Sequence, residues 1–205
     1  GAAAFTGTGN ALDNAITGNA GANRIDGGAG ADTMSGGGGN DSYWVDDSGD
    51  VIVEAASAGV DTVFTVRDWT LAANVENLTL TGTSAASLTG NASANALIGN
   101  AAANRLDGMA GADTMTGGAG DDVYVFDAAG DTAVELAGGG VDSIESSVSL
   151  TLAANVERAV LTGSAAINAT GNALNNTLLG QAGANALSGL GGDDELDGGL
   201  GNDVY

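Results

Sequence analysis

The stretch from Gly27 to Trp44, GGAGADTMSGGGGNDSYW, consists of two nonapeptides in tandem. Each has the form G-G-x-G-x-D-x-U-x, where U is a large apolar residue; the first ends at Ser35 and the second begins at Gly36. The first six residues of each nonapeptide suit a turn, because glycine adopts positive φ at little steric cost and aspartate favours turns. The last three residues suit a very short strand with its apolar side chain in the middle.

The pattern recurs at a fixed interval along the chain. The tetrapeptide TGNA begins at Thr8, at Thr89 and at Thr170, 81 positions apart each time. Since this interval is the length of nine nonapeptides, it indicates an internal repeat that keeps one solenoid register throughout. It divides the chain into the tail of a preceding repeat (1–7), two super-repeats (8–88 and 89–169) and a partial third super-repeat (170–205).

A ladder of apolar residues favours a β-solenoid. These residues fall nine positions apart, and the glycine pairs between them argue against a helix. Two nonapeptides per coil, with a strand and a turn on each side, would place every second rung directly above the last. The rungs are Ile16, Ile25, Met34, Tyr43 and Ile52, then Leu88, Leu97, Leu106, Met115 and Tyr124, then Leu178, Leu187, Leu196 and Tyr205.

Two spacers, residues 51–82 and 132–163, interrupt the short repeat. They are rich in β-branched residues, which predicts longer strands. The heptapeptide TLAANVE occurs in both spacers, at residues 70–76 and 151–157. It is compatible with a helical turn, whereas its β-rich flanks favour a strand–loop–strand segment.

The composition excludes several classes of function. Acidic residues number 26 against 4 basic residues, and the net charge of -22 repels nucleic acid and anionic lipid while it attracts cations. The chain has no run of eighteen apolar residues, so no membrane-spanning segment is expected. It also has no histidine and no cysteine, which removes the usual general base and thiol nucleophile. We therefore expect no enzymatic activity.

Glycine-rich turns that end in aspartate suit calcium. Ca²⁺ prefers six to eight hard oxygen ligands from carboxylates and backbone carbonyls, and a glycine-rich turn leaves its carbonyls uncovered. In a two-sided solenoid, alternate turns stack on the same edge about 4.8 Å apart, so one ion can lie between two of them. Ligand aspartates are therefore expected to pair at a separation of two nonapeptides, which is 18 positions.

At the sixth turn position, this separation gives two pairs of carboxylates, Asp32 with Asp50 and Asp113 with Asp131. The remaining turn aspartates stack on asparagine, which offers an oxygen but no charge, so these sites should be weaker. The mixed pairs are Asp41 with Asn23, Asp122 with Asn104, Asp194 with Asn176, and Asp203 with Asn185.

An isolated aspartate in a surface turn is usually only solvated, and we keep that interpretation for Asp26, Asp107, Glu54 and Glu135. The metal-binding residues expected from the repeat are glycines of the turns and the sixth-position aspartates. They are Gly28, Gly30, Asp32, Gly37, Gly39, Asp41, Asp50, Gly111, Asp113, Gly118, Gly120, Asp122, Asp131, Gly192, Asp194, Gly201 and Asp203.

On these motifs, the sequence resembles the RTX (repeats-in-toxin) proteins, the haemolysin-type calcium-binding repeat family of bacteria. The matching residues are 27–44, 108–125, in which Met109 replaces the second glycine, and 189–205, in which Leu190 does so. The resemblance implies an all-β, right-handed parallel β-roll that binds several Ca²⁺ ions. It also implies export by a type I secretion system and calcium-dependent folding outside the cell or at a bacterial surface.

Three hypotheses for function remain. The first is a calcium-binding extracellular structural region, such as an adhesin stalk, matrix fibre or surface layer, whose copies associate end to end. The second is a non-catalytic C-terminal secretion and folding module of a type I-secreted enzyme or toxin. The third is a β-solenoid that needs no calcium. Trp44 and Trp69 are interpreted as edge packing rather than as a sugar-binding surface.

Overall fold

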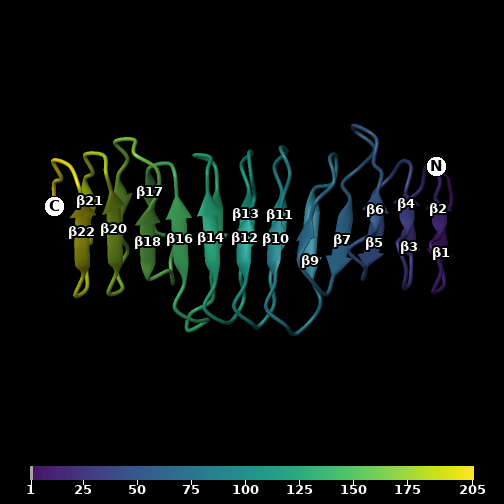
Figure 1. Cartoon of the computed structure of the whole chain (residues 1–205), viewed down its shortest axis with the longest axis horizontal. Coiled ribbons are helices and arrows are strands. Elements are labelled where there is room, and N and C mark those ends of the chain that lie inside the picture. The colour runs from purple at the N-terminus through teal and green to yellow at the C-terminus, as the bar shows by residue number, and fades with distance from the viewer. Residues whose placement is uncertain (1) are drawn as a thin grey trace.

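Short strands alternate with turns along the whole of the computed structural model, which describes residues 2–205 (Figure 1). The strands stand side by side in one row, with the two termini at opposite ends. Strands pair in parallel, each with the strand two places along the chain. Each coil therefore contributes one strand to each of two faces, and the 22 strands make 11 coils. Gly1, part of the tail expected at 1–7, lies outside the described residues.

The odd-numbered strands form one face, in a sheet of eight strands followed by a sheet of three. Their bounds are β1 (Thr6–Thr8), β3 (Arg24–Asp26), β5 (Ser42–Val45), β7 (Thr62–Thr65), β9 (Asn77–Leu80), β11 (Ala96–Ile98), β13 (Thr114–Thr116), β15 (Thr132–Val134), β17 (Leu150–Thr151), β19 (Ala169–Thr170) and β21 (Leu187–Ser188).

The even-numbered strands form the other face, in a sheet of three strands followed by a sheet of eight. Their bounds are β2 (Ala15–Thr17), β4 (Thr33–Ser35), β6 (Val51–Ile52), β8 (Trp69–Thr70), β10 (Ser87–Thr89), β12 (Arg105–Asp107), β14 (Val123–Phe126), β16 (Ser143–Ser146), β18 (Arg158–Leu161), β20 (Thr177–Gln181) and β22 (Glu195–Gly199). This arrangement confirms the expected all-β parallel solenoid. Residues 2–205 include no helix that could cross a membrane.

The core lies between the two faces and consists mainly of the nine-residue apolar ladder. Successive side chains of a strand point to opposite sides, so the middle residue of a three-residue strand points inward. Ile25, Met34, Tyr43 and Tyr124 are fully buried in this way. Burial of one large apolar side chain contributes about 1.5–3 kcal/mol, so each coil gains most of its stability by stacking on its neighbours.

The spacers change the length of the coils. Tyr43 in β5 is followed by three unequal coils, which advance the chain by 20, 15 and 19 positions between paired inward-pointing residues. Tyr124 in β14 is followed by coils of the same three lengths. The expectation of one uniform register, with two nonapeptides in every coil, is therefore wrong within the spacers. Since the three coils together match the length of three regular coils, the apolar ladder resumes in register after them.

The TLAANVE heptapeptide is a strand–loop–strand segment, as its flanks indicate. In the first spacer, β8 ends at Thr70 and β9 begins at Asn77. Leu71 and Val75 of the intervening loop are buried in the core, and Asn74 turns the chain with a φ of 65°. The loop thus lies in the shortest coil, between β7 and β9, without losing its apolar contacts.

Residues that are 81 positions apart lie on opposite faces of the solenoid. Tyr43 belongs to β5 on the odd-numbered face, whereas Tyr124 belongs to β14 on the even-numbered face. The chain advances nine strands between them, and nine strands are four and a half coils. Equivalent turns therefore lie at opposite edges of the molecule.

Replacement of Met109 by glycine should stabilise the protein. Met109 has a φ of 61°, a left-handed conformation that costs a residue with a side chain roughly 1–2 kcal/mol relative to glycine. Its side chain is 45% exposed, so little packing is lost. We expect Met109→Gly to raise the free energy of unfolding in calcium by about 0.5–1 kcal/mol, measured by urea titration. The neighbouring Ala110→Gly variant should instead lose stability, and equal gains from both would contradict this account.

Candidate metal centre

The sixth residue of each complete nonapeptide turn directly precedes a strand, and its side chain turns back into the molecule. Asp32, Asp41, Asp113 and Asp122 are at most 1% exposed. Aspartate is seldom so deeply buried unless its charge is compensated, because removal of a carboxylate from water is costly. The partners of these four carboxylates therefore determine what the turns can do.

One oxygen of each carboxylate joins two coils. Oδ1 accepts a hydrogen bond from the backbone N–H of the residue 18 positions earlier, which occupies the sixth position of the preceding turn on the same edge. The bonds run from Asn14 to Asp32, Asn23 to Asp41, Asn95 to Asp113 and Asn104 to Asp122 at 2.7 Å, and from Asn176 to Asp194 and Asn185 to Asp203 at 2.9 Å.

The second oxygen has no partner. Oδ2 is buried and lacks a hydrogen bond in Asp32, Asp41, Asp113 and Asp122. It lies where the first glycine of its own turn leaves space: a Cβ added to Gly27 would be 2.2 Å from Asp32 Oδ2. A buried anionic oxygen without a donor is costly unless a cation compensates it. Hard carboxylate oxygens are the ligands that Ca²⁺ prefers, so these residues fit calcium.

The glycines that were expected to bind metal shape the turns. All of them have positive φ, from 78° at Gly28 to 150° at Gly111, which only glycine adopts without strain. Their expected role as carbonyl ligands remains a prediction. The glycines are Gly28, Gly30, Gly37, Gly39, Gly111, Gly118, Gly120, Gly192 and Gly201.

Asp50 and Asp131 differ from the other turn aspartates. The backbone N–H groups of Asp32 and Asp113 donate to the Oδ1 atoms of Asp50 and Asp131, at 3.0 and 3.2 Å, so the residues of both expected pairs stack on one another. Oδ2 of Asp50, however, accepts from the N–H groups of Asp46 and Asp47 and closes its own turn. Asp131 is bonded in the same manner. Both oxygens of these two aspartates therefore already have donors.

The row of carboxylates continues into the spacers, where the sequence reasoning missed it. Asp61 Oδ1 accepts from the N–H of Asp41 at 2.7 Å, and Asp142 Oδ1 accepts from Asp122 at 2.8 Å. Both separations are 20 positions, whereas a count of two nonapeptides from Asp41 points instead to Gly59. Asp61 and Asp142 are fully buried, and their Oδ2 atoms also lack a partner. The recurrence of Gly-Val-Asp at 59–61 and 140–142 was the available signal.

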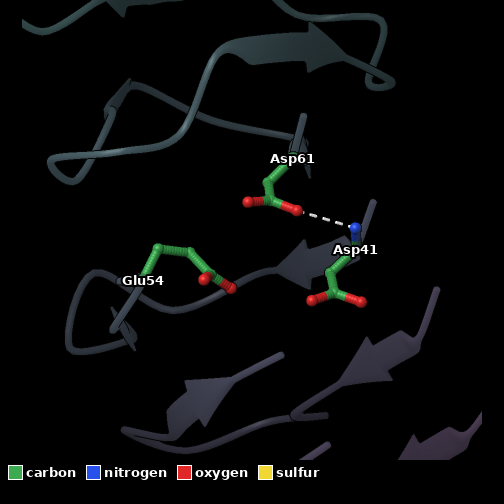
Figure 2. A group of neighbouring side chains, drawn as sticks. All are labelled: Asp41, Glu54 and Asp61. Carbon is green, nitrogen blue, oxygen red and sulfur yellow. Dashed lines mark hydrogen bonds between the residues drawn. The ribbon is translucent and has the colours of Figure 1, made fainter. Parts of the chain in front are cut away.

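A glutamate joins each of these stacked pairs. Carboxylate oxygens of Asp41, Glu54 and Asp61 lie within 4.8 Å of one another, and Figure 2 shows the three groups turned toward a common space. Asp122, Glu135 and Asp142 form an equivalent group. The interpretation of Glu54 and Glu135 as solvated surface is therefore wrong: Glu54 is half-buried and Glu135 is 9% exposed. These two groups, at equivalent positions of the two super-repeats, thus join the candidate site.

Burial makes several of these carboxyl groups hard to ionise. Loss of hydration raises the pKa of Asp61, Asp113 and Asp142 to about 6, and that of Asp122 to about 7. Backbone N–H donors oppose this rise in pKa, while neighbouring carboxylates add to it. Without a metal ion, these carboxyl groups therefore keep their protons at a higher pH than an ordinary aspartate does.

Replacement of Gly27 by alanine should weaken calcium-induced folding. The new Cβ would displace the Asp32 carboxylate, whose Oδ2 lies 2.2 Å from the ideal Cβ position. We expect the calcium midpoint, followed by circular dichroism, to rise at least threefold. Gly38→Ala is the matched control, since its Cβ would have no neighbour closer than 3.6 Å. A similar shift in both variants would contradict the role given to the first glycine.

In chelator, the protein should lose stability as pH rises. The raised pKa values of about 6 to 7 exceed the ordinary value of 3.8, so the folded state binds more protons than the unfolded state between them. This contribution is complete below pH 3.8 and is lost as pH rises through 6 to 7. Circular dichroism in EDTA at a series of pH values measures it as the folded fraction, which should fall toward that of an unfolded chain as pH approaches neutrality. Stability that increases with pH over this range would contradict the expectation.

Comparison with known proteins agrees with this geometry. Residues 8–43, 89–132 and 170–205 match the model of the RTX calcium-binding nonapeptide repeat family. None of the curated proteins compared with the chain matches it. The first two matched segments hold the turns whose aspartates carry the unpartnered Oδ2 atoms at positions 32, 41, 113 and 122. They cover more than half of the sequence, and the chain belongs to the RTX calcium-binding nonapeptide repeat family.

Proposed function

We propose that this chain is a calcium-binding structural region of a secreted bacterial protein, which folds when it meets Ca²⁺ outside the cell. The observation that carries the proposal is the set of buried Oδ2 atoms without partners, repeated from turn to turn. The family match supports calcium as the cation. Asp32, Asp41, Asp113 and Asp122 would hold the ions, with Asp194 and Asp203 in the last coils.

Folding of this chain must overcome both conformational entropy and the repulsion of its negative charges. Without a cation, the net charge of -22 opposes a compact state, and the 36 glycines lose much conformational entropy on folding. A cation that binds only the folded state adds about 2.7 kcal/mol per site at a free concentration 100 times its Kd. The coils stack on nearest neighbours, so ions bound at several turns reinforce one another.

The same balance of repulsion and cation binding supports a location outside the cell. Proteins of this family are typically secreted. Where free calcium is low, as inside a cell, the chain would remain unfolded and suited to export by a type I system. Outside the cell or at its surface, calcium would complete the turns. The absence of cysteine is compatible with an extracellular site because the fold needs no disulfide.

A mechanical role suits the architecture. Solenoids of this kind, built from repeats alone, are typically non-catalytic. We propose that the units at 8–88, 89–169 and 170–205, preceded by a tail at 1–7, act as successive segments of a stalk, fibre or surface layer. Strands at the edge of a sheet readily pair with further strands. This property supports association of copies end to end wherever a terminal coil leaves its strands unpaired.

Calcium removal tests the proposal. In EGTA we expect the circular dichroism spectrum of an unfolded chain, and in millimolar Ca²⁺ that of a β-protein. Asp32→Asn together with Asp113→Asn should raise the calcium midpoint several-fold, because asparagine keeps the Oδ1 acceptor but removes the charge. The control is Asp26→Asn with Asp107→Asn, which should leave the midpoint unchanged. A β-spectrum that persists in EGTA would instead support a calcium-independent solenoid.

A further inference from the structure

The widest turn of each spacer encloses a group of acids unlike the repeated turns. Between β6 and β7, the chain needs residues 53–61 to reach the next strand, whereas the preceding turn on that edge uses residues 36–41. The extra length brings Glu54 against Asp41 and Asp61, the two aspartates stacked across the coils. Three carboxylates therefore meet where a repeated turn supplies one aspartate stacked on an asparagine.

Two of the three carboxylates point unpaired oxygens into this space. Asp41 and Asp61 are 1% and 0% exposed, and Oδ2 of each is buried without a hydrogen-bond donor. The ion pairs found within residues 2–205 join Arg24 to Asp26 and Arg105 to Glu145, so neither neutralises this group. The negative charge of the cluster thus has no protein cation beside it.

The third carboxylate is held in place from the core. Tyr43 is fully buried, and its hydroxyl donates to Glu54 Oε1 while it accepts from the N–H of Gly36 at 2.6 Å. The backbone N–H of Gly36 also donates to Glu54 Oε1 at 3.3 Å. In the folded chain Glu54 is therefore held by protein donors rather than by the ligand, which reduces the entropy lost when an ion binds there.

The same arrangement recurs at the equivalent turn of the second super-repeat, although three of the nine turn residues differ. Residues 134–142 read VELAGGGVD, whereas residues 53–61 read VEAASAGVD. Tyr124 again donates to the glutamate, Glu135, and accepts from Gly117 at 2.8 Å. The unpartnered oxygens recur on Asp122 and Asp142. Both super-repeats therefore place the same acids around an equivalent space, on opposite edges of the solenoid.

We propose that the Asp41–Glu54–Asp61 and Asp122–Glu135–Asp142 clusters are a separate class of hard-cation site, which binds Ca²⁺ more tightly than the repeated turns do. Ligand charge sets calcium affinity, and three carboxylates exceed the one or two that stacked turns offer. The inference rests on the proposed function, because the clusters assemble only when the coils fold. Each chain therefore holds two tight sites, one per spacer, in addition to the weaker sites of the turns.

Ion counting by calorimetry on the whole chain tests this inference. For the unmodified protein we expect two classes of Ca²⁺, with two ions in the tighter class. Glu54→Gln with Glu135→Gln keeps an acceptor for each tyrosine but removes one charge per cluster, and should weaken the tight class at least tenfold. The matched control, Asp26→Asn with Asp107→Asn, removes the same charge elsewhere and should leave both classes intact.

Single variants keep the test decisive if the double variant folds poorly. Glu54→Gln alone should leave one tight ion per chain, and Glu135→Gln alone should do the same. An unchanged tight class in these variants, or an equal loss in the control, would overturn the separate sites while calcium-dependent folding stood. Failure of the unmodified protein to bind Ca²⁺ or to fold with it would overturn the proposed function itself.

Discussion

The fold depends on the different roles of the two carboxylate oxygens of each turn aspartate. Oδ1 of Asp32 or Asp113 accepts an N–H from the coil before it and so fixes the stacking of two turns. Oδ2 of the same residue lies buried against the first glycine of its turn, where a side chain would collide with it. Neighbouring coils are therefore joined by a group whose remaining charge the protein does not neutralise. Stability and cation binding arise from one side chain.

The apolar core stays continuous although the coils of the spacers differ in length. The turns at the edges take up these differences. The unequal coils of the first spacer still align Tyr43, Val63 and Leu78 on the inner side of their strands. Parallel pairing requires only that each strand match its neighbour, so extra or missing residues are absorbed at the edges. The longer turn supplies Glu54, and the shorter one buries Leu71 and Val75. Differences in turn length therefore change which side chains the turns supply.

The sequence predicted the features that recur at a fixed period, which are the apolar ladder and the stacked turn residues. The nine-residue spacing of Ile25 and Met34 identifies the core, because only a solenoid brings such residues to one interior. The stacking of Asp41 on Asn23 follows from the same count. Asp61 and Glu54 were missed since their positions depend on how a widened turn folds, which no fixed period describes. The burial of Glu54 also needs the Tyr43 hydroxyl beside it, a contact between residues 11 positions apart.

The step of nine strands from Tyr43 in β5 to Tyr124 in β14 gives the described part of the molecule an internal screw symmetry. One step turns the chain by half a revolution and moves it four and a half coils, roughly 22 Å at the usual strand spacing. A bivalent partner bound at one edge would meet the next equivalent turn on the reverse side. Neither flank of the solenoid is therefore unique. It presents equivalent turns to both sides of its long axis.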